Sequence, residues 1–207
     1  QLIDFAPEAI VVLDLGSGKF IDANPRAQNL FGFDRNALLN LGPVDLSPEI
    51  QENGRRSVDV VGEYLARATA GEIPVFEWLH KNSDGEIIPC EVRLLLLPDK
   101  DGAKLRGSIT DIRERRKAQA LIQSLEVGIV VQGPKTEILL CNPKALQLLG
   151  LTEGQLRGLS SYDPGWNILD DAEKPFQPAD RPVAQAIRTK RPVRGVVIGV
   201  QHRQNAS

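Results

Sequence analysis

The chain of 207 residues contains 42% hydrophobic and 25% charged residues, which is typical of globular proteins and excludes the disordered and fibrous classes. Its formal net charge of −2 gives no general attraction to phosphate backbones or anionic membranes, so we expect neither nucleic-acid nor membrane-surface binding. The sequence has no run of 18 or more apolar residues, so no membrane segment is predicted.

The two cysteines, Cys90 and Cys141, lie far apart inside separate apolar runs. This placement favours buried free thiols over a disulfide framework, and it predicts a reducing compartment, by default the cytoplasm. The sequence contains no Met and starts at Gln1, so we expect it to be a piece of a longer protein.

Two short strands and a capped helix are predicted at the start of the chain. The β-prone runs 9–14 and 19–23 flank a glycine-containing turn. Asn24 can accept a backbone N–H as the N-cap of a helix, and Pro25 suits the first helical position. Gly32 is placed to end this helix after one short apolar face.

A longer helix and three strands follow. Residues 58–70 are predicted to form a helix with one apolar stripe, made of Val58, Val61, Leu65 and Ala68. Residues 75–97 alternate as two long strands around a turn at 83–85, and a further strand covers roughly 104–112.

Residues 113–126 are good helix formers and predict a connecting helix. Its start, "RERRKAQ", carries positive charge, but Glu114 dilutes the charge and no aromatic residues interleave. We therefore interpret it as a solvated helix, with one seam available to a second copy, and not as a nucleic-acid site.

The beginning of the chain recurs in its second half. Strand-like residues 138–141 lead into Asn142-Pro143, an apolar helical segment and Gly150, in the same order as around Asn24. A helix over 182–190 and a strand over 192–200 follow. The second copy has no room for two final strands, so we expect a truncated sheet with an exposed edge.

In combination, "DANPRAQNLFGF", "FEWLHKNSDGEIIPCEV" and "SITDIRERRKAQ" resemble the PAS sensory domain family. The resemblance implies an α+β fold: a five-stranded antiparallel sheet with helices on one face, as one complete copy plus a second, truncated copy. The expected organisation is a first PAS domain over 1–112, a connecting signalling helix over 113–126 and a second PAS domain over 127–207.

The resemblance further implies a sensory region that detects a small ligand, a cofactor state or a partner. The change would pass through the linker helix to an output domain, such as a histidine kinase or a diguanylate cyclase, with a homodimer formed through the sheet or the helix. The residues that match the family's tail are the expected relay, although Arg113 replaces the usual Thr: Asp111, Ile112, Glu114 and Arg115. The alternative is a ligand-free dimerisation module, and an enzyme is disfavoured.

Phe76, Trp78 and His80 alternate along one predicted strand and share one face, where they would line a pocket together with Tyr64. Plain core packing is the alternative and the favoured interpretation. The cofactor stays unknown: the helix 58–70 lacks the His expected of haem-binding relatives, which leaves only His80 as an axial ligand, and no Asn-Cys-Arg motif supports a flavin adduct. No catalytic or metal-ligating set is predicted.

Overall fold

The computed structural model of the chain describes residues 6–98, 103–157 and 166–202. The chain divides into two compact units, residues 1–117 and residues 118–207. Each unit is described by itself below.

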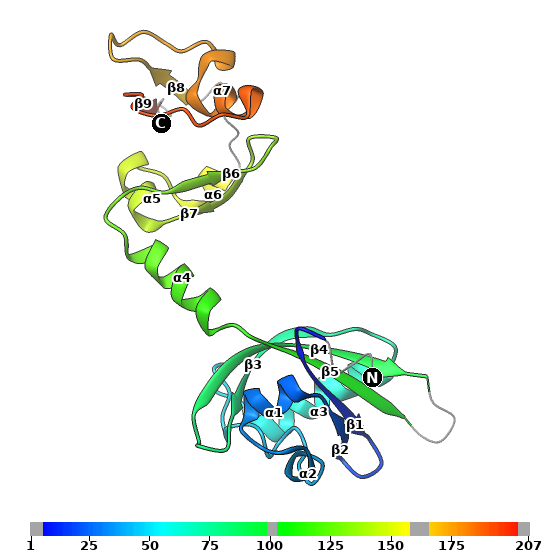
Figure 1. Cartoon of the computed structure of the whole chain (residues 1–207). Coiled ribbons are helices and arrows are strands. Elements are labelled where there is room, and N and C mark those ends of the chain that lie inside the picture. The colour runs from blue at the N-terminus through cyan, green and yellow to red at the C-terminus, as the bar shows by residue number, and fades with distance from the viewer. Residues whose placement is uncertain (1–5, 99–102, 158–165, 203–207) are drawn as a thin grey trace. The chain divides into compact units, whose positions relative to one another are not determined.

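The first unit is built on a five-stranded antiparallel sheet with the strand order β2-β1-β5-β4-β3. Three helices lie on one face of this sheet (Figure 1). The α+β class and the five-stranded sheet with helices on one face are therefore confirmed. The strands are β1 (Ala9–Asp14), β2 (Lys19–Ala23), β3 (Val75–Lys81), β4 (Ile87–Leu97) and β5 (Lys104–Asp111), and the helices are α1 (Pro25–Phe31), α2 (Arg35–Leu38) and α3 (Ser57–Thr69).

The buried side chain of Asn24 joins the start of α1 to β1. Its Oδ1 accepts the N–H of Ala27, as an N-cap does, and also the N–H of Ile10, at 2.9 and 3.0 Å. Its Nδ2 donates to the Glu8 carbonyl at 3.0 Å. Gly32 then ends α1 at a positive φ of 71°, which a glycine adopts without steric cost. The predicted cap and stop are both confirmed.

The apolar stripe of α3 differs from the prediction. Val58 is 46% exposed, whereas Val60 is 4% exposed and Ala68 is fully buried. Val60 belongs to the core between α3 and the sheet, while Val61 and Leu65 pack against that core from partly buried positions. The spacing of apolar residues fitted two neighbouring faces of the helix, and tertiary packing selected the one that contains Val60.

The second unit repeats the opening of the first. In it, β6 (Val130–Gln132) pairs with β7 (Ile138–Cys141), and α5 (Pro143–Leu149) follows. Asn142 caps α5 through the N–H of Ala145 and accepts the N–H of Ile129. Its Nδ2 also lies within hydrogen-bond distance of three carbonyls at and after the end of α4 (Arg113–Ser124), those of Ile122, Leu125 and Val127.

The predicted strand over 192–200 is mostly wrong. Only β9 (Gly199–His202) is extended and paired, and its partner is β8 (Trp166–Leu169), which the sequence did not predict. Within the described part of this unit the strands form two separate two-stranded sheets, β6-β7 and β8-β9. The helices α6 (Glu153–Arg157) and α7 (Pro182–Thr189) complete it, together with a short 3-10 helix over Pro178–Asp180.

Candidate functional site

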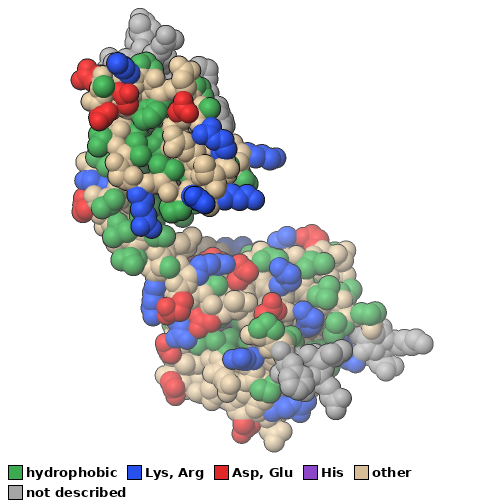
Figure 2. Space-filling view, turned by 45° about the horizontal axis from the view of Figure 1, so that its top comes forward, with side chains coloured by type: hydrophobic (Ala, Val, Ile, Leu, Met, Phe, Trp, Pro, Cys, Tyr) green, Lys and Arg blue, Asp and Glu red, His purple; other side chains and the backbone are tan. Residues whose placement is uncertain are grey.

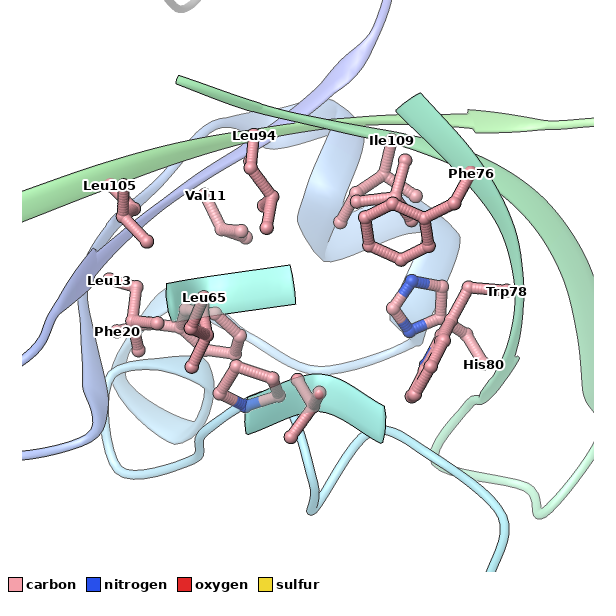
Figure 3. Close-up of a pocket in the computed structure, with 14 residues that line it drawn as sticks. Val11, Leu13, Phe20, Leu65, Phe76, Trp78, His80, Leu94, Leu105 and Ile109 are labelled. Carbon is pink, nitrogen blue, oxygen red and sulfur yellow. The ribbon is translucent and has the colours of Figure 1, made fainter. Parts of the chain in front are cut away.

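A cavity of about 50 Å³ lies between the sheet and α3 in the first unit. Aliphatic side chains from β1, β4 and β5 form one wall, and Val61 and Leu65 of α3 lie among the residues of the other. Phe76, Trp78 and His80 project into it from β3, as Figure 3 shows. Three of the four predicted pocket residues therefore do share one face and do line one cavity.

Two loop residues hold the polar atoms of Trp78 and His80. The indole Nε1 of Trp78 donates to the Ser47 Oγ at 2.9 Å, and His80 Nδ1 lies 3.1 Å from the Leu46 carbonyl. A carbonyl oxygen only accepts, so Nδ1 carries the proton and Nε2 of the neutral ring is an acceptor. Among the described residues, no group forms a hydrogen bond with His80 Nε2.

Burial keeps the His80 ring neutral. The side chain is surrounded by the core, with the ring of Phe31 edge-on at 5.1 Å between centroids. Desolvation lowers the pKa of His80 from 6.5 to about 4, and the Leu46 carbonyl opposes this only in part. At neutral pH the His80 ring is therefore uncharged, and its Nε2 is a buried acceptor beside a lining that is otherwise apolar.

Tyr64, the fourth predicted pocket residue, contacts Phe76 but does not itself line the apolar cavity. Its ring stacks on Phe76 with 3.5 Å between ring centroids, and it lines a separate polar cleft together with Glu52, Glu77 and Trp78. Tyr64 thus packs against Phe76, which does line the cavity, and holds that ring in place.

The predicted relay residues Asp111 and Ile112 fasten the end of β5 to the start of α4. Asp111 accepts from the backbone N–H of Arg113 at 2.9 Å and from its guanidinium group. Ile112 is buried, and its N–H donates to the Pro89 carbonyl of β4 at 3.0 Å. Partial burial acts to raise the pKa of Asp111, but the hydrogen bonds from Arg113 outweigh it and the pKa is lowered. Arg113 thus holds this turn through both its backbone N–H and its side chain.

Three arginines at the start of α4, Arg113, Arg115 and Arg116, contact acidic residues of the sheet and of its loops. We call them the arginine clasp. Arg113 contacts Glu86 in the β3–β4 turn at 2.7 Å. Arg115 is bonded to Glu77 of β3 at 3.0 Å and to Glu91 of β4 at 3.1 Å.

Glu77 is the centre of this arrangement. It lies directly opposite Glu91 in the β3–β4 register, where two like charges would repel each other, and Arg115 bridges them. Arg116 joins Glu77 to Glu52, which precedes α3. Hydrogen bonds from Arg116 lower the pKa of both Glu52 and Glu77. The sequence analysis missed Glu52, Glu77 and Arg116, although the alternation along β3 does place Glu77 on the face opposite Trp78.

The remaining predicted residues have simpler surroundings. Glu114 is largely exposed and pairs with Lys117 one turn along α4. Cys90 and Cys141 are both buried and free, and burial raises the pKa of the Cys90 thiol to about 12, which suppresses the reactive thiolate. No cluster of His, Cys, Asp or Glu that could hold a metal ion occurs among the described residues.

A haem or a flavin does not fit the cavity as it stands. Cofactor sites usually enclose several hundred Å³, whereas this cavity has about 50 Å³. Its lining also contains neither a cation for a propionate or phosphate group nor a cysteine.

On the face visible in Figure 2, acidic and basic side chains are intermingled over both units. Within the described ranges, no helix is long and apolar enough to cross a membrane.

Comparisons with known proteins agree on one family. A family model described as PAS fold matches residues 3–117, and another described as PAS domain matches residues 116–186. No curated protein matches the chain.

Three solved structures similar to the chain come from sensory proteins or PAS domains. One is a domain of a sensory box sensor histidine kinase/response regulator from Geobacter sulfurreducens, with 29% identity, 53% of this chain and 88% of that chain covered, and a TM-score of 0.44. A PAS domain from Colwellia psychrerythraea has 22% identity, coverages of 55% and 92%, and a TM-score of 0.47. The PAS domain of an HTR-like protein from Haloarcula marismortui has 23% identity, coverages of 54% and 86%, and a TM-score of 0.45.

Proposed function

The chain belongs to the PAS family of sensory signalling domains, and we propose that its first unit couples the occupancy of the apolar cavity to the position of α4. One observation carries the proposal: β3 has cavity residues on one face and, on the other, an acidic residue that the arginine clasp binds. Phe76, Trp78 and His80 line the cavity, while Glu77 between them binds Arg115 and Arg116. A ligand that displaces β3 would therefore act on both faces of this strand.

The coupling needs two arrangements of β3 and α4 that a ligand binds with different affinity, because only differential binding shifts an equilibrium. The clasp suits this role. The side chains of its ion pairs are one third to about one half exposed, and solvent-exposed pairs contribute only about 0.2–1 kcal/mol each. The start of α4 is thus held by several weak contacts that a small movement of β3 can break. Buried Ile112 keeps the junction between β5 and α4 in place.

Replacing Glu77 with Gln tests the clasp without any ligand. The variant Glu77→Gln loses both charge-assisted contacts to Arg115 and Arg116, so α4 amides 116–120 should exchange hydrogen about fivefold faster. Hydrogen exchange followed by mass spectrometry measures this. Glu63→Gln is the matched control, because Glu63 of α3 makes a similar exposed ion pair with Arg55, which precedes α3. Equal exchange in Glu77→Gln and wild type contradicts the proposed relay.

A second candidate function is self-association through α4. Leu121 of α4 is 62% exposed, and Leu125, the first residue after the end of α4, is also exposed, so the end of the helix offers a short apolar surface. We expect a homodimer by light scattering and a monomer for Leu121→Glu. Gln123→Glu, which adds the same charge on another face of α4, should leave the dimer intact. A wild-type mass that stays monomeric over a wide concentration range excludes this function.

The proposed setting is bacterial signal transduction in the cytoplasm, which the two free buried cysteines support. The second unit would be a further PAS domain, and α4 would be the connecting helix between the two. The output domain, proposed as a histidine kinase or a diguanylate cyclase, would belong to a longer parent chain. The family resemblance supports these assignments.

A further inference from the structure

The orphan nitrogen of His80 restricts what the cavity can bind. This inference rests on the proposed function, because it specifies the ligand class for the same cavity. His80 is 6% exposed, its ring points into the cavity (Figure 3), and its Nε2 has no hydrogen-bond partner among the described residues. A buried acceptor without a partner costs about 1–3 kcal/mol, so a ligand that donates to it gains that free energy.

Water does not satisfy this nitrogen well. A buried water usually needs two to four polar partners. The other side-chain nitrogens of the lining residues already have partners: Trp78 Nε1 donates to Ser47, and His80 Nδ1 is bonded to the Leu46 carbonyl. The remaining lining is aliphatic or aromatic, so a water at Nε2 would have one partner only.

Charged molecules are excluded as well. The lining contains no acidic or basic side chain other than His80, and His80 is neutral at physiological pH because of its burial. An ion in such a site would keep the desolvation cost without a counter-charge. We propose that the cavity binds a small, uncharged, mostly apolar molecule with one hydrogen-bond donor, a hydroxyl or an N–H, that is received by His80 Nε2.

The inference can be tested with 1-butanol and 1-chlorobutane, which have nearly the same shape but differ in the donor. Their affinities are measured by NMR titration for the wild type and for His80→Leu. We expect the preference for the alcohol over the chloride to be about tenfold larger in the wild type than in His80→Leu. The comparison within each protein cancels the different hydration of the two probes.

His80→Leu is suited to this cycle because it should not leave a new orphan group. The Leu46 carbonyl also accepts the N–H of Lys81 at 2.8 Å, so it keeps a partner when the imidazole is removed. If the variant fails to fold, the ¹⁵N resonance of His80 Nε2 in the wild type gives the answer. It should move upfield with 1-butanol, as for a nitrogen that begins to accept a hydrogen bond, and not with 1-chlorobutane.

Two outcomes overturn the inference. One is the same preference in both proteins with an unmoved Nε2 resonance, and the other is no binding of either probe to the wild type. Neither outcome bears on the role of the arginine clasp as a relay, because the hydrogen-exchange experiment on Glu77→Gln uses no ligand. Failure of the ligand class and failure of the relay are therefore distinguishable.

Discussion

Asn24→Ala should destabilise the first unit by about 3 kcal/mol. The substitution removes an N-cap, which costs about 1 kcal/mol, and leaves the buried N–H of Ile10 and the partly buried carbonyl of Glu8 without this partner. Urea unfolding followed by Trp78 fluorescence measures the loss. Trp166→Phe is the background, since the chain contains two tryptophans.

Asn40→Ala is the matched control, because the Asn40 side chain makes one exposed bond to the Asn36 carbonyl and its loss should change stability by less than about 0.5 kcal/mol. Asn142→Ala removes the equivalent cap of the second unit. If the two units unfold independently, Asn142→Ala should leave the urea unfolding transition reported by Trp78 unchanged. If the urea midpoint reported by Trp78 is the same for Asn24→Ala as for Asn40→Ala, the structural role given to Asn24 is contradicted.

Acid should weaken the first unit through His80 by about 3 kcal/mol between pH 7 and pH 4. The pKa of His80 is about 4 in the folded protein and about 6.5 in the unfolded chain. The unfolded state therefore binds the proton first as the pH falls. The stabilising contribution of the neutral ring is complete above pH 6.5 and is lost as the pH falls towards 4, at 1.36 kcal/mol per pH unit.

The comparison of wild type with His80→Leu isolates this contribution, because the carboxylates that also titrate are common to both proteins. The difference in the free energy of unfolding between them should shift by about 3 kcal/mol in favour of His80→Leu from pH 7 to pH 4. The imidazole protons of His80 should titrate near pH 4 in NMR spectra. A His80 titration midpoint near pH 6.5 would mean that the ring is solvated. That result contradicts the buried, neutral imidazole described above.

Local chemistry explains what the sequence could predict. Asn24-Pro25 and Asn142-Pro143 start helices through their own side chains and fixed φ, and the alternation of Phe76, Trp78 and His80 needs only an extended backbone. These features were confirmed because neighbouring residues determine them. The domain boundaries and the relay remain predictions.

The features that failed or were missed depend on distant partners. The β-prone run at 192–200 forms a strand only from Gly199, because the partner strand β8 offers four residues for pairing. The pairing of Glu77 with Arg116 spans 39 residues, and the His80 bond to Leu46 spans 34. Periodicity can assign Glu77 to a face of β3, but it cannot show that an arginine of α4 lies on that face.

Hydrogen exchange of α4 with and without 1-butanol tests the central claim, that the cavity and the linker helix are coupled through β3. The alcohol is large for a cavity of about 50 Å³, one third of an engineered cavity that holds benzene, so its binding should displace β3. We predict faster exchange of amides 116–120 in the wild type and no further increase in Glu77→Gln. Unchanged exchange in the wild type, while the NMR titration shows the cavity filled, contradicts the account.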